Sequence, residues 1–179
     1  MKKMMVMMFS VLVVAAMLVV PAAGAANGNG GGGGQVSSKD KVFLVGAMQT
    51  DLMEIKSGEV AMKQGKSQGV VKLGELLARA HSKLLGAGGK LARELGVPVP
   101  KTPSATMMQK MKALASKTGS AFDRAYAKMM VMGHEEAIEK ATNEIQAGSN
   151  KLIVAVAKKD VPIYEQHLRD AEKVMKELR

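Results

Sequence analysis

The sequence has no cysteine and no tryptophan, and aromatic residues make up only 3% of its 179 residues. The absence of cysteine excludes disulfide bonds, thiolate metal sites, a thiol nucleophile, iron–sulfur clusters and a lipid anchor on cysteine. The scarcity of aromatic residues argues against an antiparallel sheet protein, in which such residues are enriched. What remains is rich in Leu, Ala, Met and Lys, a composition typical of packed helices.

Residues 1–25 are predicted to be a secretory signal peptide. Lys2 and Lys3 form a basic start, residues 4–20 form an uncharged, mostly apolar run, and small residues at 23–25 offer a cleavage site. The alternative is an uncleaved membrane anchor, for which the run is at the short limit. We therefore expect export to the periplasm or cell envelope, with no transmembrane segment in the mature chain.

Residues 26–40 are rich in Asn, Gly and Ser and contain five consecutive glycines at 30–34. This stretch has nothing to bury, so we interpret it as a flexible tether that precedes a folded domain at 41–179. A phosphate-binding loop is a poor alternative, because no strand precedes the glycines and no Gly-Lys-Ser/Thr ending follows.

Positive charge dominates the chain, with a net charge of +10 to which Lys2 and Lys3 contribute two. An exported protein does not meet genomic DNA, so no nucleic acid partner is expected. The charge instead suggests an anionic envelope component, such as a lipid head group or lipopolysaccharide. The alternative is that the charge serves solubility alone.

Helical periodicity predicts an all-α protein, a ferritin-like four-helix bundle with a long crossover that contains a short extra helix. Ser120 is the predicted N-cap of the third long helix, with Asp123 three residues later. Pro162 is expected to kink the fourth. Turns at 67–69 and 148–150 would form two hairpins. The four long helices and the short one are expected at about 41–66, 70–95, 121–148, 151–178 and 105–116.

Three histidines, His81, His134 and His167, lie one each on the second, third and fourth long helices, all on apolar faces. His134 lies fifteen residues before Ser149 and His167 eighteen after it, so both fall near mid-height of their hairpin. With the first turn centred at Gln68, the position level with His81 is near Glu54. The pattern predicts that these four side chains meet.

Three imidazoles and a carboxylate can hold one Zn, Fe, Cu or Mn ion. The alternative is a hydrogen-bonded network without metal, for which Asp123, Tyr126 and Tyr164 are available partners. A ferritin-type di-iron centre is excluded, because no histidine follows a Glu at the Glu-x-x-His spacing. Methionines around the third helix are a weaker copper-site candidate, or core residues: Met107, Met108, Met111, Met129, Met130 and Met132.

Four stretches resemble an exported bacterial family of unknown function that is often given the label outer membrane protein. They are Met53–Ala61, Leu77–His81, Phe122–Tyr126 with Met130 and His134, and Val161–Leu168. The resemblance covers about residues 41–178 and implies a ferritin-like fold and export. Ala80 stands where the family usually has Asp, and Leu85 where it often has Asn, which weakens hydrogen-bonded support for His81.

Two functional hypotheses follow. The first is an exported bundle that binds one metal ion, or holds a buried polar centre, through Glu54, His81, His134 and His167. The second is a structural or interaction module that binds an anionic envelope component through its basic surface. An enzyme with a mononuclear centre is a weaker third, since no catalytic residue can be identified.

Overall fold

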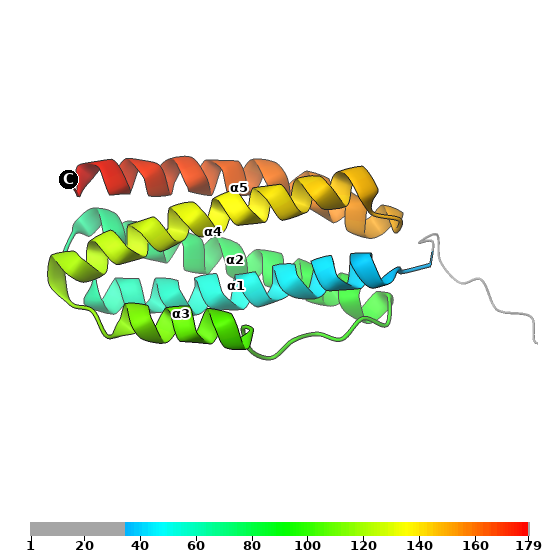
Figure 1. Cartoon of the computed structure of the whole chain (residues 1–179), viewed down its shortest axis with the longest axis horizontal. Helices are drawn as coiled ribbons and strands as arrows, with labels where there is room; N and C mark the ends of the chain where they lie inside the picture. The colour runs from blue at the N-terminus through cyan, green and yellow to red at the C-terminus, as the bar shows by residue number, and fades with distance from the viewer. Residues whose placement is uncertain (1–34, 179) are drawn as a thin grey trace, which may run out of the picture. The chain divides into compact units, whose positions relative to one another are not determined.

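A computed structural model describes residues 35–178 and shows a four-helix bundle with a fifth, shorter helix on the crossover (Figure 1). The predicted fold class is thereby confirmed. No strand occurs within the described range. The predicted signal peptide and the tether up to residue 34 lie outside it. The helices are α1 (Ser38–Gln64), α2 (Gln68–Glu94), α3 (Ala105–Ala115), α4 (Gly119–Ala147) and α5 (Lys151–Glu177).

Two antiparallel hairpins, α1–α2 and α4–α5, make up the bundle, and each has a three-residue turn. The long connection between them runs outside the bundle and contains α3, which packs against α1 and α4 (Figure 1). Pro162 does not interrupt α5, which is one helix through that position. No helix within 35–178 is long and apolar enough to cross a membrane.

The first helix begins earlier than the sequence suggested. Ser37 caps α1 in a capping box with Asp40, and the Asp40 carboxylate accepts hydrogen bonds from the Ser37 amide (2.9 Å) and hydroxyl (2.7 Å). Asp40 is fully buried. The predicted tether of residues 26–40 was therefore too long by the three residues 38–40, which belong to the bundle.

The predicted cap of α4 was wrong. Thr118 is the N-cap, Gly119 adopts a left-handed φ of 57°, and Ser120 lies in the first turn. Asp123 has a different role from capping its own helix. Its carboxylate accepts hydrogen bonds from the amides of Lys66 (2.9 Å) and Ser67 (2.7 Å) in the α1–α2 turn.

These two aspartates tie the hairpins together at opposite ends. At one end Asp123 of α4 binds the α1–α2 turn. At the other end Asp40 of α1 accepts hydrogen bonds from Ser149 in the α4–α5 turn, from its amide at 2.9 Å and its hydroxyl at 2.5 Å. Hydrogen bonds to charged groups contribute more than neutral ones, about 1.5–3 kcal/mol each. The register between the hairpins is thus fixed at both ends.

Backbone packs against backbone where α1 crosses α2. A Cβ on Gly58 would lie 2.5 Å from the carbonyl oxygen of Gly74, and a Cβ on Gly74 would lie 2.8 Å from the oxygen of Gly58. Both distances are too short for a side chain. The two glycines therefore set the separation of α1 and α2. Next to this contact, the core of the bundle is filled by Leu77, Phe122, Tyr126 and Met130, among others.

Glu144, near the end of α4, is buried beside Asp40, and its carboxyl fills the space that a side chain at Gly148 would occupy. Burial, and then the adjacent Asp40 carboxyl, raise the pKa of Glu144 to about 7. For Asp40, burial would raise the pKa, but hydrogen bonds from Ser149 and Ser37 outweigh it and hold the pKa well below its usual range.

The raised pKa predicts that Glu144 destabilises the fold at alkaline pH. The folded state holds the Glu144 proton more tightly than the unfolded state, so its favourable contribution disappears as pH rises through about 7. Glu144→Gln cannot ionise. We expect the unfolding free energy of the variant, relative to that of wild type, to be higher at pH 8.5 than at pH 5 by about 1–2 kcal/mol. Urea unfolding at the two pH values measures this difference. An unchanged difference between the two proteins at the two pH values would contradict this.

Candidate metal centre

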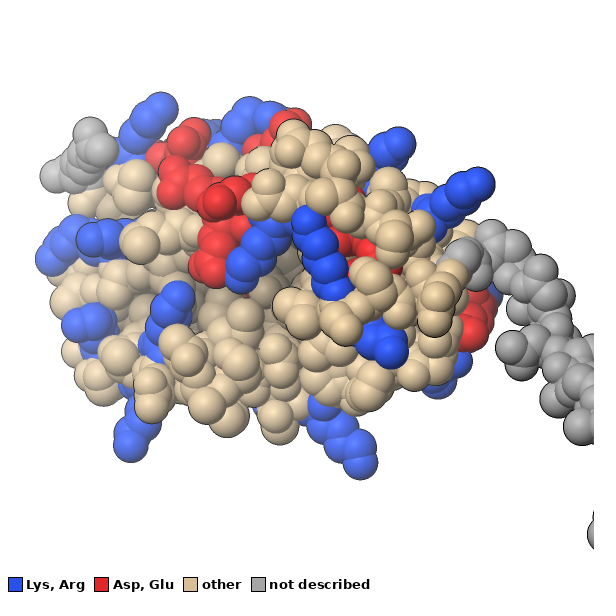
Figure 2. Space-filling view, turned by 45° about the vertical axis from the view of Figure 1, so that its right-hand side comes forward, with Lys and Arg blue, Asp and Glu red and all other residues tan. Residues whose placement is uncertain are grey.

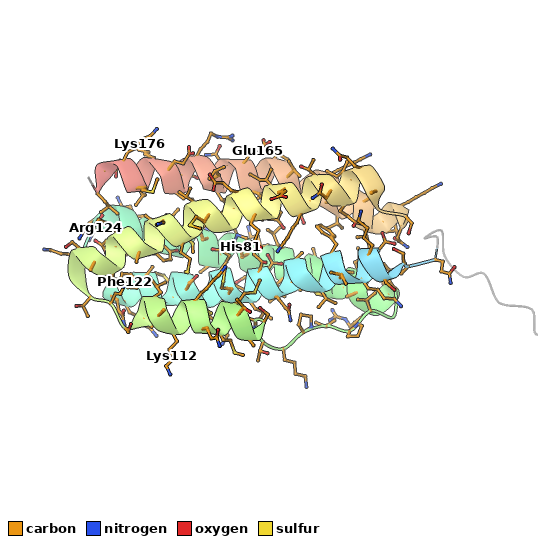
Figure 3. All side chains as sticks on the ribbon, viewed as in Figure 1. His81, Lys112, Phe122, Arg124, Glu165 and Lys176 are labelled. Atoms are coloured by element: carbon orange, nitrogen blue, oxygen red, sulfur yellow. The ribbon has the colours of Figure 1, made fainter. Side chains whose placement is uncertain are left out.

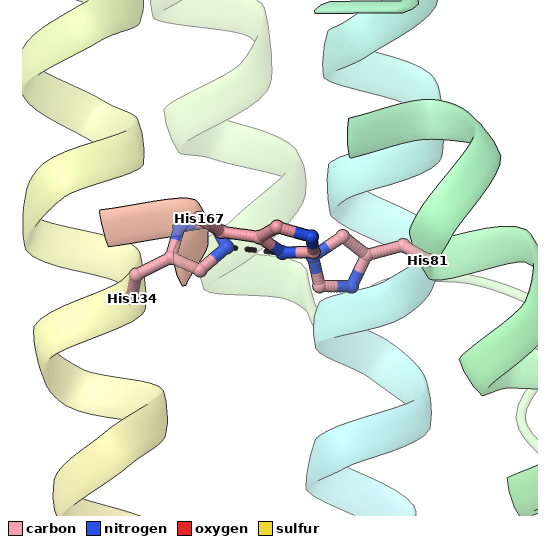
Figure 4. Close-up of side chains that lie close together, drawn as sticks. All are labelled: His81, His134 and His167. Carbon is pink, nitrogen blue, oxygen red and sulfur yellow. Dashed lines mark hydrogen bonds between the residues drawn. The ribbon is translucent and has the colours of Figure 1, made fainter. Parts of the chain in front are cut away.

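The three histidines are buried inside the bundle, one each on α2, α4 and α5. Relative exposure is 1% for His81, 1% for His134 and 5% for His167. His81 lies at mid-bundle in Figure 3, whereas labelled charged residues such as Lys112 and Lys176 point outward. Figure 4 shows the three imidazoles converging from their separate helices. The sequence-based prediction that they meet is confirmed for these three residues.

One nitrogen from each ring lies within 4.8 Å of the other two. The His81 and His134 Nε2 atoms are 3.4 Å apart, and the ring of His167 is centred 5.2 Å from each of the other two rings. Two nitrogens bound to one tetrahedral ion at about 2.0–2.1 Å would lie about 3.4 Å apart. The Nε2 pair is thus already at the spacing that a shared ion requires.

Asp51, which sequence reasoning missed, hydrogen-bonds to His81. Its Oδ1 lies 2.8 Å from His81 Nδ1, and both side chains are buried. The error came from the turn, which is centred at Lys66 and not at Gln68. Asp51 is fifteen residues before Lys66 and His81 fifteen after it, so the corrected centre places them at one height.

A backbone carbonyl fixes the orientation of His134. Its Nδ1 lies 2.8 Å from the oxygen of Met130, and a carbonyl oxygen can only accept. Nδ1 must therefore carry the hydrogen, and in the neutral ring Nε2 keeps its lone pair. That lone pair faces the other two imidazoles, as a metal ligand requires.

Burial keeps all three imidazoles neutral at physiological pH. It lowers the pKa of His81 to about 4. Burial, followed by the neighbouring His81, lowers that of His134 to about 4 against the opposing Met130 hydrogen bond. The pKa of His167 falls to about 3 through burial and then the other two histidines. Neutral imidazole is the form that binds metals.

Glu54 is buried near these rings but outside the donor group. Neither of its oxygens belongs to the set of atoms within 4.8 Å of one another. Both oxygens, the hydroxyl of Tyr126 and Nδ1 of His167 are buried without a hydrogen-bond partner. Such atoms cost about 1–3 kcal/mol each and point to a bound water or ion. Glu54 as a ligand stays a prediction.

Three carboxyl groups in this part of the bundle, on α1 and α5, have raised pKa values. Burial raises the pKa of Asp51 to about 8, and burial followed by Asp51 raises that of Glu54 to about 8. On α5, burial and then Asp51 raise the pKa of Asp160 to about 6. Asp160 was also missed by sequence analysis, although it lies two turns before His167 on the same helix.

The proposed supporting residues have different outcomes. Tyr164 does belong to the cluster, since its ring stacks on His81 at 6.3 Å with an interplanar angle of 6°. Asp123 does not, because it binds the α1–α2 turn. Tyr126 stacks on Phe122 at 6.0 Å, and its hydroxyl has no partner. The methionines are divided between core and surface: Met130 is fully buried, whereas Met108 and Met132 are exposed.

One member of the cluster, His167, lines a surface cavity. The cavity, of about 340 Å³, lies between α2 and α5 and is also lined by Arg79, Lys83 and Asp170. His167 is thus the histidine of the three that borders this cavity, whereas His81 and His134 line neither it nor the other described pockets.

Comparison with known proteins supports the fold and the family. A DUF305 fragment from Deinococcus radiodurans superposes with a TM-score of 0.69 at 12% identity, covering 79% of this chain and 98% of that one. A DUF305 protein from Streptomyces coelicolor, described as a candidate secreted protein, gives 0.66 at 16% identity, covering 79% and 94%. At these identities the likeness shows the fold alone.

No curated protein matches the sequence significantly. The resemblance to a family of unknown function is confirmed, whereas the comparisons give no support to the outer membrane label. The profile of the DUF4142 family, a domain of unknown function, matches residues 26–174, and this chain belongs to that family.

Proposed function

We propose that this protein is an exported metal-handling protein that binds one transition-metal ion through His81, His134 and His167. The observation that supports it most is the 3.4 Å spacing of two Nε2 atoms on neutral, buried rings with a third ring beside them. Zn, Fe, Cu or Mn suits such a nitrogen set. Glu54 is the candidate fourth ligand. No reaction is proposed.

The alternative to a metal ion is a hydrogen-bonded network in which Asp51 keeps its proton, here called the proton-linked network. With Asp51 protonated, a neutral chain runs from its hydroxyl to His81 Nδ1, from His81 Nε2 to His134 Nε2, and from His134 Nδ1 to the Met130 carbonyl. This chain leaves His167 Nδ1 and both Glu54 oxygens without partners. An ion and its bound water would satisfy them, which favours the metal.

The test is metal content. The protein, purified without a His-tag, is offered Zn, Cu, Fe and Mn in turn and examined by native mass spectrometry and elemental analysis. We expect about one equivalent of one metal, and none in the double variant H81A/H134A. Absence of retained metal in wild type, with the bundle folded by circular dichroism, would leave the proton-linked network as the role of the histidines.

Export is part of the proposal. It is supported by the signal-like pattern of residues 1–25 and by a structural neighbour described as a candidate secreted protein. In the periplasm or envelope, a small bundle with one buried ion site would serve metal handling or protection against metal stress. Fractionation of cells that express the tagged chain, followed by N-terminal sequencing, would test the location.

Asp51 is expected to strengthen the site through His81. When an ion binds and the Asp51 proton is released, the Asp51 carboxylate would accept from His81 Nδ1–H and leave Nε2 free for the ion. Removal of such a partner lowers metal affinity about 10–100-fold. We expect that loss in Asp51→Ala and a smaller one in Asp51→Asn, whose amide oxygen can still accept. Competition against a chromophoric chelator measures it. Equal affinity in wild type and Asp51→Ala would show that Asp51 plays no part.

A further inference from the structure

An open groove of about 700 Å³ lies between the first half of α1 and the second half of α4, away from the cavity at His167. Pockets that hold small molecules have volumes of about 300–1,000 Å³. Figure 2 shows this side of the molecule hollowed, with Lys or Arg side chains and also Asp or Glu side chains beside the hollow. The groove is thus large enough for a ligand that is distinct from a metal ion.

The wall of the groove is apolar. Phe43 and Ala47 of α1 and Ala137 of α4 line it, and Val42, also in the lining, is 74% exposed. Tyr164 of α5 reaches the groove from the bundle interior. Apolar surface of this kind is stabilised when it is covered by hydrocarbon.

The charges at the groove are mostly positive. Lys39, Lys41 and Lys140 line it, and all three are exposed. Lys140 pairs with Glu136 at 2.6 Å on the surface, an interaction of little net strength. The acidic lining residue, Glu144, is buried with its carboxyl against Gly148. An anionic head group would therefore find cations at the edge of an apolar channel.

We propose that this groove binds a single-chain amphiphile with an anionic head, of the long-chain carboxylate class. The hydrocarbon chain lies against Phe43, Ala47 and Ala137, and the carboxylate meets Lys39 and Lys41. The proposal does not depend on the metal centre. The two sites are separated by the ring of Tyr164, which stacks on His81.

Gly46 offers a way to close the groove without harming the fold. It lines the groove, and a Cβ built on it meets no atom within 4 Å. Gly46→Leu places a side chain in the channel and also removes a helix-interior glycine. Gly86 of α2 is the matched control, since it has equally open surroundings and does not line the groove.

Laurate is the probe, titrated below its micellar concentration into the full chain by calorimetry and native mass spectrometry. We expect one laurate per chain, affinity at least 10-fold weaker in Gly46→Leu, and a change of less than twofold in Gly86→Leu. Dodecylammonium, with the same chain and the opposite charge, should bind at least 10-fold more weakly than laurate. Lys41→Glu should reduce the ratio of the laurate affinity to the dodecylammonium affinity at least threefold. Tyrosine emission offers a second readout, because the chain has no tryptophan.

Three results would overturn the proposal. The first is no stoichiometric laurate binding by wild type. The second is equal binding of laurate and dodecylammonium, which would mean that the lysines recognise nothing. The third is a wild-type protein that is dimeric and does not bind laurate, with a Gly46→Leu variant that is monomeric. That result would make the groove an interface between two copies of the chain.

Discussion

Replacement of His134 by alanine is expected to lower metal affinity about 10²–10³-fold. Structural zinc sites with four ligands contribute about 10–16 kcal/mol, so loss of one ligand removes about 3–4 kcal/mol. His134 is chosen because its Nε2 is the donor whose lone pair is fixed by the backbone, through Nδ1 and Met130. The measurement is the shift in melting temperature on addition of metal, which depends on affinity by mass action.

Phe122→Leu is the matched control for this experiment. Phe122 lies on the same helix, is equally buried, and has no polar side-chain atom that an ion could bind. Its replacement should leave the metal-induced shift within about 1 °C of wild type. A shift that survives in His134→Ala would contradict the histidine site. A large loss of metal-free stability in His134→Ala, with no metal effect in wild type, would favour the proton-linked network.

Gly58→Ala and Gly46→Ala are expected to change stability in opposite directions, although both replace a glycine within α1. Alanine is favoured over glycine in a helix by about 1 kcal/mol. At Gly46 the new methyl group meets nothing within 4 Å, so that gain remains. At Gly58 it would lie 2.5 Å from the backbone oxygen of Gly74, and α1 must move away from α2. Overpacking of this kind costs about 1–3 kcal/mol.

Thermal unfolding by calorimetry or circular dichroism would measure this difference. For a protein of this size, 1 kcal/mol shifts the melting temperature by about 2–4 °C. We expect Gly46→Ala to melt higher than wild type and Gly58→Ala lower by up to about 10 °C. Stabilisation by both variants would show that the helices can separate at little cost.

The sequence was sufficient to predict the bundle because its pattern is local. Val70, Leu77, His81 and Leu91 recur at helical spacing, and the structure buries all four on α2. Helix ends were less predictable, since they depend on distant partners. Ser120 resembled a cap, yet Asp123, which should have supported it, is hydrogen-bonded to a turn 56 residues earlier in the chain.

The candidate site was predicted in part for the same reason. His81, His134 and His167 were identifiable as rare polar residues on apolar faces. Asp51 was missed because the predicted centre of the α1–α2 turn was two residues too late. That error moves the residue of α1 expected at the height of His81 from Asp51 to Glu54. The contact between Gly58 and Gly74 was also not predicted, because a glycine pattern does not show which glycines face each other.

The division of the bundle into two hairpins has a consequence for when a metal can be acquired. The α1–α2 hairpin supplies His81 and the α4–α5 hairpin supplies His134 and His167, so neither half holds the full set. A chain in transit, or a fragment cut in the long connection, lacks a complete binding site. Under the proposed function, the ion would be taken up in the compartment where the two halves assemble, and its metal supply would decide which ion the protein holds.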